Sequence, residues 1–196
     1  MIRSQNLNNA FFTSANDGSL KEILKSVGIQ NRAATMNQTH SSHIAFADLY
    51  KTYESDGIYT DKILLPLVVK TADCVPILME SKNRVSATHA GWRGLEKLIF
   101  EKSLEVHDIP SLRISIGPHA RKCCYEVGVE VGEKFKNSIN KVENKYYLDL
   151  VKNIKNFAFE NSINLEDTGV CTICNDKYFS YRKNKTNERQ FSLIWI

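Results

Sequence analysis

The chain has 196 residues, of which 42% are hydrophobic and 24% are charged, and its net charge is +4. Since a typical domain holds about 150 residues, this length predicts one domain over residues 1–196 with a substantial hydrophobic core. The charged fraction excludes a disordered chain, and the small positive charge argues against a nucleic-acid-binding protein.

The sequence also bears on location and on the use of its cysteines. No apolar run reaches the roughly 18 residues that a membrane span needs, and the first residues lack the apolar stretch of a secretory signal peptide. The five cysteines are an odd number and include the adjacent pair Cys123-Cys124, which is a poor framework for disulfides. We therefore expect a cytoplasmic protein without a membrane partner, whose cysteines are buried, metal-bound or catalytic.

Hydrophobic periodicity and turn residues predict a mixed set of elements. Residues 1–20 are typical of a terminal strand or hairpin. Apolar spacing over 19–27 indicates a short helix that ends at Gly28, and a tight turn is expected over 91–94. The other strands are expected over 63–70, 75–79, 85–89, 112–116, 168–173 and 191–195, and the other helices over 95–106, 129–139 and 148–161.

This order lacks a clean alternation of strand and helix. It therefore predicts an α+β fold, a single domain with a mixed β-sheet core and flanking helices, rather than a doubly wound sheet. Neither a G-x-G-x-x-G nor a G-x-x-x-x-G-K-[ST] motif is present, which removes support for a dinucleotide site or a P-loop.

Three segments place His40, Cys74 and His89 at the ends of expected strands or in the loops that follow. Three protein ligands and one open position are the arrangement of a catalytic zinc site. The same residues suit a Cys–His nucleophile pair, in which Cys74 is activated by either histidine for acyl transfer. A third interpretation is purely structural, because a single cysteine after a strand often packs as a small hydrophobic residue.

A second metal hypothesis uses Cys171 and Cys174, whose C-x-x-C spacing is common at zinc sites, together with Cys123-Cys124 and His119. It is disfavoured because adjacent residues on a strand point to opposite faces.

A basic stretch over 177–189 is interleaved with aromatic residues, which is a pattern found on nucleic-acid-binding surfaces. For residues 183–189 we favour a solvated loop. Arg182 is expected to stay near the sheet, where a guanidinium can bind phosphate or carboxylate with two hydrogen bonds.

Several segments match the motif order of one known family. Residues 89–94, HAGWRG, match its hallmark without a change. The weaker matches are Gln38-Thr39-His40, Asp56-Gly57, the ADC-x-P segment in 71–78, Gly117-Pro118, the YEVG segment at 125–128, Cys171-Thr172, the FSYR segment at 179–182 and the closing strand at 192–195. On these residues the chain resembles the YfiH family, also called the laccase-domain or polyphenol-oxidase-like family, to which human FAMIN is related. Asn31-Arg32 is similar to a further Asn-Arg of the family.

The resemblance implies a YfiH-like fold and a zinc site made of His40, Cys74 and His89. It also implies a transferase that phosphorolyses purine nucleosides (adenosine, inosine, guanosine and methylthioadenosine) and a hydrolase activity that deaminates adenosine. The family's copper-laccase label is disfavoured here, because multicopper oxidases need more histidines than the five of this chain.

Further residues are assigned on the chemistry that this reaction needs. Arg93 and Arg182 are the expected phosphate ligands, and Gln38 is an additional substrate-binding candidate. Asp73 is the nearest carboxylate to Cys74 and the first candidate for catalytic acid or base, with Glu126 second. A turn or supporting role suits Asp73 equally well.

The main rival is a Cys–His hydrolase or a cell-wall precursor editing factor with Cys74 as nucleophile, followed by a copper polyphenol oxidase and a nucleic-acid-binding module. The family's usual N-terminal Gly-Gly-x-Ser turn is not visible in the 37 residues before Gln38. We therefore expect a shortened N-terminal region and a pocket wall that is absent, rebuilt or supplied by a partner. The sequence does not fix the oligomeric state.

Overall fold

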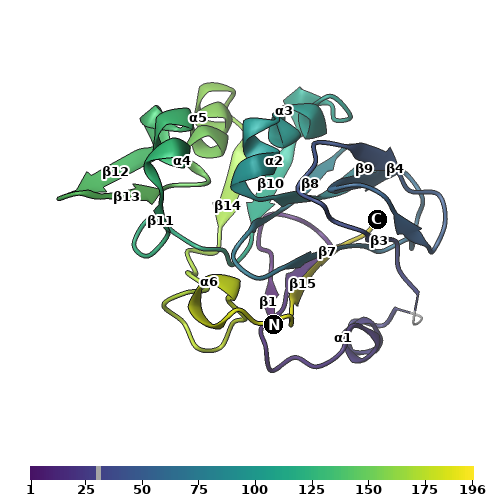
Figure 1. Ribbon diagram of the computed structural model, residues 1–196. Coiled ribbons are helices and arrows are strands. Elements are labelled where there is room, and N and C mark those ends of the chain that lie inside the picture. The colour runs from purple at the N-terminus through teal and green to yellow at the C-terminus, as the bar shows by residue number, and fades with distance from the viewer. Residues whose placement is uncertain (30–31) are drawn as a thin grey trace.

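The computed structural model describes residues 1–29 and 32–196. Two β-sheets pack face to face, and helices cover their outer faces (Figure 1). This is the expected α+β architecture with a mixed-sheet core. Asn31 of the Asn-Arg match lies outside the described residues. No helix in the described ranges is long and apolar enough to cross a membrane.

The larger sheet has six strands in the order β14-β10-β8-β9-β6-β4. Strands β8 and β9 form an antiparallel hairpin at its centre, while β14 runs parallel to β10 and β4 runs parallel to β6. Its strands are β4 (Ile44–Phe46), β6 (Gly57–Thr60), β8 (Val75–Ser81), β9 (Arg84–Ala90), β10 (Arg113–Ile116) and β14 (Asn164–Asp167).

The second sheet is antiparallel, with the order β1-β2-β15-β7, and it pairs both chain ends with the strand that leads to Cys74. Helix α1 (Leu20–Ser26) packs Ile23 and Leu24 against its outer face. Ser19 and Glu22 form a capping box at the start of this helix. The strands are β1 (Ile2–Arg3), β2 (Ala10–Phe12), β7 (Leu67–Thr71) and β15 (Gln190–Ile194).

Smaller elements complete the chain. Two short sheets are β3 (Thr35–Met36) with β5 (Thr52–Tyr53), and β11 (Glu126–Val127) with β13 (Lys145–Leu148) and β12 (Ile139–Val142). The other helices are α2 (Trp92–Glu96), α3 (Ile99–Leu104), α4 (Val129–Lys134), α5 (Lys152–Glu160) and α6 (Tyr181–Asn184), with 3-10 turns at Ile109–Ser111 and Lys136–Ser138.

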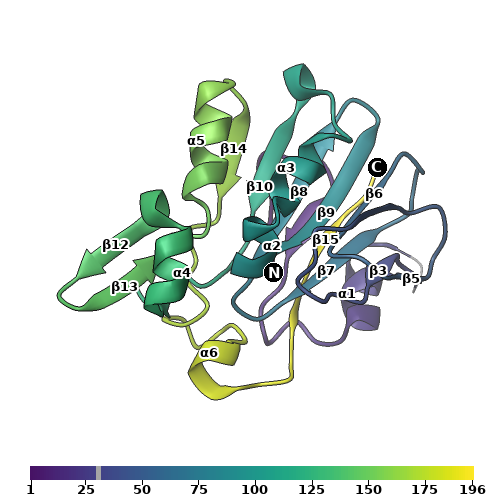
Figure 2. The same cartoon turned by 45° about the horizontal axis from the view of Figure 1, so that its top comes forward.

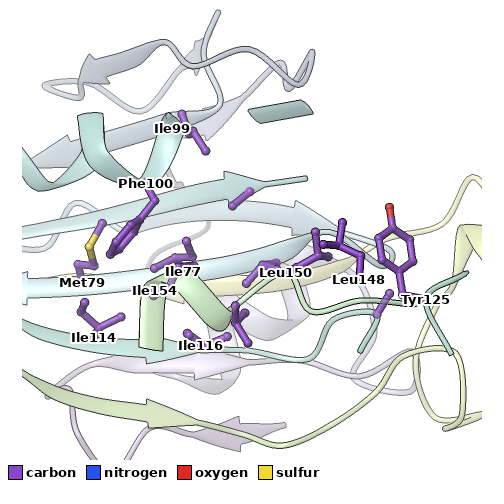
Figure 3. Packing of buried hydrophobic residues seen from close by; sticks show 14 of the residues in the cluster. Ile77, Met79, Ile99, Phe100, Ile114, Ile116, Tyr125, Leu148, Leu150 and Ile154 are labelled. Carbon is purple, nitrogen blue, oxygen red and sulfur yellow. The ribbon is translucent and has the colours of Figure 1, made fainter. Parts of the chain in front are cut away.

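Strand β8 contributes side chains to two separate hydrophobic cores, because successive side chains alternate between the faces of the sheet. Ile77 and Met79 pack under α3 and α5 with Phe100 and Ile154 (Figure 3). Leu78 points the other way, into the layer between the two sheets. Helices α2, α3 and α5 lie together over the same face of the six-stranded sheet (Figure 2). The central hairpin is thus fixed from both sides, which makes its ends a rigid support for a site.

The structure differs from several of the predicted elements. Residues 91–94 begin helix α2 instead of forming an isolated turn, and the expected helix over 95–106 is interrupted at Leu98, whose φ is +64°. The expected helix over 129–139 ends at Lys134, because Ile139 starts a hairpin whose strands pair with each other. The strand expected over 168–173 lies earlier, at β14, where it pairs with β10.

The strand expected over 63–70 also starts later, at Leu67, because Pro66 has no N–H to give to a strand ladder. Pro66 is a local signal, whereas the positions of β14 and of the β12–β13 hairpin depend on strand pairing, which local periodicity does not encode.

Candidate functional site

A cavity of about 810 Å³ lies where α2, α6 and the ends of β3, β7 and β9 meet. Of the eight residues that the sequence singled out for the site, all but Glu126 line it: Gln38, His40, Asp73, Cys74, His89, Arg93 and Arg182.

The centre of the cavity wall is a His–Cys trio formed by His40, Cys74 and His89. Their ligand atoms lie within 4.8 Å of one another. Cys74 Sγ is 3.6 Å from His40 Nε2, and the two imidazole rings meet edge to face with centroids 4.9 Å apart. His40 comes from the loop after β3, Cys74 follows β7 and His89 lies on β9. Two imidazoles and a thiolate that share an open cavity match the donor set of a catalytic zinc site.

Asp56 supports the trio from the side away from the cavity, although sequence analysis assigned it no role beyond a motif match. Its carboxylate is fully buried and accepts a hydrogen bond from His89 Nδ1 at 2.7 Å. It also accepts from the backbone N–H groups of Thr39, His40 and Ser41, at 3.2, 3.0 and 2.6 Å. These bonds fix the loop that presents His40, whose φ of +60° is left-handed.

The charge of Asp56 is stabilised by the same contacts. Burial alone would raise the pKa of its carboxyl group, but hydrogen bonds from His89 and Ser41 hold that pKa well below its ordinary value. An ionised carboxylate on Nδ1 leaves Nε2 of His89 free to bind a metal in the cavity.

Gly91 of the HAGWRG segment is required on geometric grounds. A Cβ atom at this position would lie 2.8 Å from Cys74 Sγ and 2.8 Å from His40 Cδ2. Only glycine leaves the space in which the trio's donor atoms converge. Gly91 therefore shapes the candidate metal site as well as the turn.

Cys74 and His89 form a coupled acid–base pair. Burial opposes the Cys74 thiolate, but the charge of His89 and hydrogen bonds from both histidines lower the pKa of Cys74 to about 6. Burial likewise opposes the His89 imidazolium, while the Cys74 charge and the bond to Asp56 raise the pKa of His89 to about 9. The site therefore favours a thiolate near neutral pH, which is the form that binds metals and acts as a nucleophile.

Asp73 faces the cavity, but both of its carboxylate oxygens are engaged. Oδ1 accepts from Thr172 Oγ1 at 2.7 Å, and Oδ2 accepts from the backbone N–H of Arg182 at 2.6 Å. Its φ of +96° marks a forced turn between β7 and β8. This geometry favours the supporting role over the catalytic one, because Asp73 ties three segments of the cavity wall together.

The side chain of Gln38 is also occupied. Its Nε2 donates to Lys70 O at 2.7 Å, and its Oε1 accepts from Lys70 N at 2.9 Å. Gln38 thus fixes the His40 loop to the edge of β7. Glu126, the second acid–base candidate, does not line the cavity and pairs with Lys145 at 3.1 Å.

Positive charge dominates the cavity wall. Arg93 stacks on Trp92 at 4.3 Å, and Arg182 lies over the Tyr125 ring at 4.9 Å and donates to Glu126 O. The lining also includes Lys70, Lys185 and Arg189, against Asp73 as the one carboxylate among the lining residues. The 183–189 loop, expected to be only a solvated segment, therefore contributes cations to the cavity.

An aromatic wall is the feature that sequence reasoning missed most clearly. Trp92 lines the cavity from α2, Tyr125 from the loop before β11 and Tyr181 from α6. Trp92 lies in the HAGWRG segment and Tyr125 in the YEVG segment, and sequence analysis assigned neither ring a role. Only the tertiary structure shows that their rings surround the same space.

None of the other four cysteines lines this cavity. They lie in the turns over 122–124 and 171–174, and their sulfurs are within 4.8 Å of one another. His119 is not part of that group, because it is buried with its Nδ1 at 2.8 Å from Gly117 O.

Comparison with known proteins agrees with the geometry. The family model described as multi-copper polyphenol oxidoreductase laccase matches residues 14–196. Proteins named purine nucleoside phosphorylase from Aquifex aeolicus and Clostridium acetobutylicum are each 37% identical to this chain, over 73% and 81% of it and over 71% and 75% of their own lengths. The purine nucleoside phosphorylase YfiH of Escherichia coli is 28% identical over 90% of this chain and 79% of its own length.

Solved structures show the same fold. A YfiH protein of Bacillus licheniformis superimposes with a TM-score of 0.77 at 23% identity, covering 88% of this chain and 77% of its own. A Neisseria meningitidis protein superimposes with a TM-score of 0.78 at 23% identity, covering 96% and 90%. The chain belongs to the YfiH family, whose family model is described as multi-copper polyphenol oxidoreductase laccase.

Proposed function

We propose that this protein is a zinc-dependent purine nucleoside phosphorylase that accepts adenosine, inosine, guanosine and methylthioadenosine. The observation that carries the proposal is the combination, in one cavity, of the His–Cys trio, an aromatic wall and five cationic side chains. Relatives at 37% identity that are named purine nucleoside phosphorylases support it.

Zinc fits the residues of the trio. The donors are two imidazole nitrogens and a thiolate, Gly91 leaves room between them, and Asp56 orients His89. Zinc bound there supplies a Lewis acid inside the cavity. Copper oxidase chemistry has less support. Of the groups of possible metal ligands among the described residues, the trio alone contains histidine, whereas multicopper sites need many histidines.

The remaining residues suit phosphorolysis. In this reaction a phosphate oxygen forms a bond to C1′ of the nucleoside while the C1′–N bond breaks, and the electron pair leaves with the purine. Arg93 and Arg182 bind the phosphate and balance its charge. The rings of Trp92 and Tyr125 offer flat apolar surfaces on which a purine stacks. Asp73 acts as a positioning residue, because it holds the backbone of Arg182.

The direct test compares His89→Ala with the matched variant His43→Ala. His43 is exposed, bonds to Glu54 O and lies outside the trio. We expect His89→Ala to lose trio-bound zinc and to lower phosphorolysis by more than the roughly 10–100-fold typical for losing an outer partner of a metal ligand. His43→Ala retains both. Wild-type turnover by His89→Ala protein without zinc in the trio contradicts the proposal.

Product analysis separates the two activities. With adenosine and phosphate, phosphorolysis yields adenine and ribose 1-phosphate. We further propose adenosine deaminase activity at the same site, which yields inosine and ammonia. Deamination needs no phosphate, so inosine formation must persist in phosphate-free buffer, whereas adenine formation must stop. Absence of inosine under both conditions rejects the deaminase proposal and leaves the phosphorylase proposal standing.

A Cys–His hydrolase is the second candidate, because Cys74 lies 3.6 Å from His40 and its pKa is lowered to about 6. The two candidates predict opposite behaviour of Cys74. If the thiolate binds zinc, zinc protects it from iodoacetamide and chelation exposes it. If the thiolate is a nucleophile, an activated ester traps an acyl-Cys74 adduct, which mass spectrometry detects.

A further inference from the structure

Four cysteines form a second cluster outside the cavity. Cys123, Cys124, Cys171 and Cys174, here called the four-cysteine cluster, have all their sulfurs within 4.8 Å of one another. Cys174 Sγ lies 2.6 Å from Cys124 Sγ and 3.5 Å from Cys123 Sγ. In a tetrahedral site with Zn–S bonds of about 2.3 Å, the sulfurs are about 3.8 Å apart. We propose that the four-cysteine cluster binds a second, structural zinc ion.

The backbone of the first turn removes the objection that adjacent cysteines diverge. That objection holds for an extended strand, where neighbours point to opposite faces. Cys123 and Cys124 instead lie in a turn over 122–124, in which the N–H groups of Cys124 and Tyr125 both donate to Arg121 O, at 2.9 and 2.8 Å. The curved backbone lets both sulfurs face the same point, and the sequence-based expectation was wrong on this count.

The second pair has the spacing of a zinc knuckle. Cys171 and Cys174 delimit a turn over 171–174, so that a C-x-x-C segment presents two sulfurs from one tight loop.

The number of ligands identifies the class of site. Four protein sulfurs complete the tetrahedral coordination of zinc and leave no position for substrate, which is typical of structural sites. The soft thiolate set selects zinc over magnesium or calcium. On binding, the thiol protons are released to solvent as the four Zn–S bonds form. The His–Cys trio, by contrast, offers three ligands and faces a cavity.

The location shows what such an ion would stabilise. The two turns follow β10 and β14, which are parallel neighbours with Ile116 opposite Asp167. Beyond β10, Ala120 N donates to Asp73 O, and beyond β14, Thr172 Oγ1 donates to Asp73 Oδ1. Tyr125 of the aromatic wall directly follows Cys124. Zinc in the four-cysteine cluster would therefore clamp the two loops that support Asp73 and one side of the cavity.

The experiment measures zinc per chain by elemental mass spectrometry after purification under reducing conditions with added zinc. We expect two zinc ions in the wild-type chain, one in Cys74→Ser and one in Cys174→Ser. Cys74→Ser is the matched control, because it removes a cysteine from the trio and leaves the four-cysteine cluster intact. The remaining ion of Cys174→Ser must be lost when His89→Ala is added.

A spectroscopic readout keeps the proposal testable if Cys174→Ser does not fold. The His89→Ala chain retains all four clustered cysteines, so cobalt(II) added to it must give the intense visible bands of tetrahedral thiolate coordination. The proposal is overturned if His89→Ala binds neither zinc nor cobalt. It is equally overturned if thiol titration in denaturant with chelator shows a disulfide between Cys124 and Cys174 in place of four free thiols. Neither result bears on the proposed nucleoside chemistry at the trio.

Discussion

The His–Cys trio and the four-cysteine cluster are built differently, although each gathers its donor atoms within 4.8 Å of one another. The trio draws one ligand from each of three distant segments, depends on the buried Asp56 for its shape and opens into a cavity of about 810 Å³. The four-cysteine cluster takes two ligands from each of two turns and does not face that cavity.

Under the two zinc proposals, this difference separates two uses of a metal. An open, incomplete ligand set held by a remote carboxylate leaves room for substrate, which is what catalysis needs. A closed set of four ligands within two turns leaves no open position and can only join its loops. Perturbing the two groups separately therefore tests whether each does what its geometry indicates.

The largest effect is expected for Asp56→Asn. The introduced amide has one acceptor oxygen where the carboxylate has two, and its NH₂ group would face backbone N–H donors. Each buried N–H group that loses its acceptor destabilises the fold by about 1–3 kcal/mol. We expect zinc affinity at the trio to fall by about 10–100-fold, with a matching loss of phosphorolysis and a lower melting temperature. Zinc at the four-cysteine cluster stays bound.

Asp167→Asn is the corresponding variant beside the four-cysteine cluster. Asp167 makes two hydrogen bonds with Arg121, at 2.8 and 2.9 Å, beside the turn that carries Cys123. We expect Asp167→Asn to weaken zinc binding at the four-cysteine cluster and to leave zinc binding at the trio unchanged. Equal losses at both groups in both variants would show that the two regions behave as one unit and would contradict the comparison.

Gly91→Ala should act on the trio through shape alone. Its Cβ would lie 2.8 Å from both Cys74 Sγ and His40 Cδ2, and such overpacking costs about 1–3 kcal/mol. We expect reduced zinc content at the trio and reduced turnover with unchanged zinc at the four-cysteine cluster. Gly128→Ala is the control, because its Cβ would meet nothing closer than 3.9 Å. A fully active Gly91→Ala enzyme would mean that the space beside Cys74 and His40 is not needed for activity.

Arg182→Ala tests the cavity wall between the two groups. The variant keeps the backbone N–H that binds Asp73 and removes the guanidinium that lies over Tyr125. Loss of a charge-assisted contact of about 1.5 kcal/mol predicts a roughly tenfold higher KM for phosphate with zinc content unchanged at both groups. Lys183→Ala, one residue away and paired with Asp176, leaves the KM unaltered. Unchanged phosphate kinetics in Arg182→Ala would remove Arg182 from the binding site.

The sequence predicts the ligands better than it predicts their support. His40, Cys74 and His89 lie in short segments with local signals, and the structure brings all three together. Asp56 acts across 33 residues to reach His89, and only the pairing of β6 with β9 reveals this contact.

The dependence on contacts between distant segments also explains two further features that the sequence did not predict. The adjacency of Cys123 and Cys124 argued against a metal site only because a strand was assumed, whereas the chain forms a turn there. The hairpin from Ile139 to Leu148 was not predicted, and cross-strand pairing places Ile139 in it and not in the helix expected over 129–139. Tertiary pairing settles both cases, and local patterns do not contain it.

The smallest effect at neutral pH is expected from His107, which lies outside both metal-ligand groups. Burial and the charge of Arg84 lower its pKa from 6.5 to about 4, and its ring nitrogens face Ser81 and Ser86 hydroxyls at 2.7 and 2.8 Å. Because the unfolded chain binds the proton more readily, this histidine's contribution to stability is complete above pH 6.5. It is lost as the pH falls towards 4, at up to about 1.4 kcal/mol per pH unit.

His107→Gln removes that titration and keeps a polar partner for the hydroxyls. Acid also protonates the metal ligands, but it does so equally in both proteins, so the difference between their unfolding curves isolates His107. We expect the free energy of unfolding to fall less steeply between pH 6.5 and 4 in His107→Gln, with identical zinc content at pH 7. Parallel curves would show that acid acts on stability through the metal-ligand groups and not through this buried imidazole.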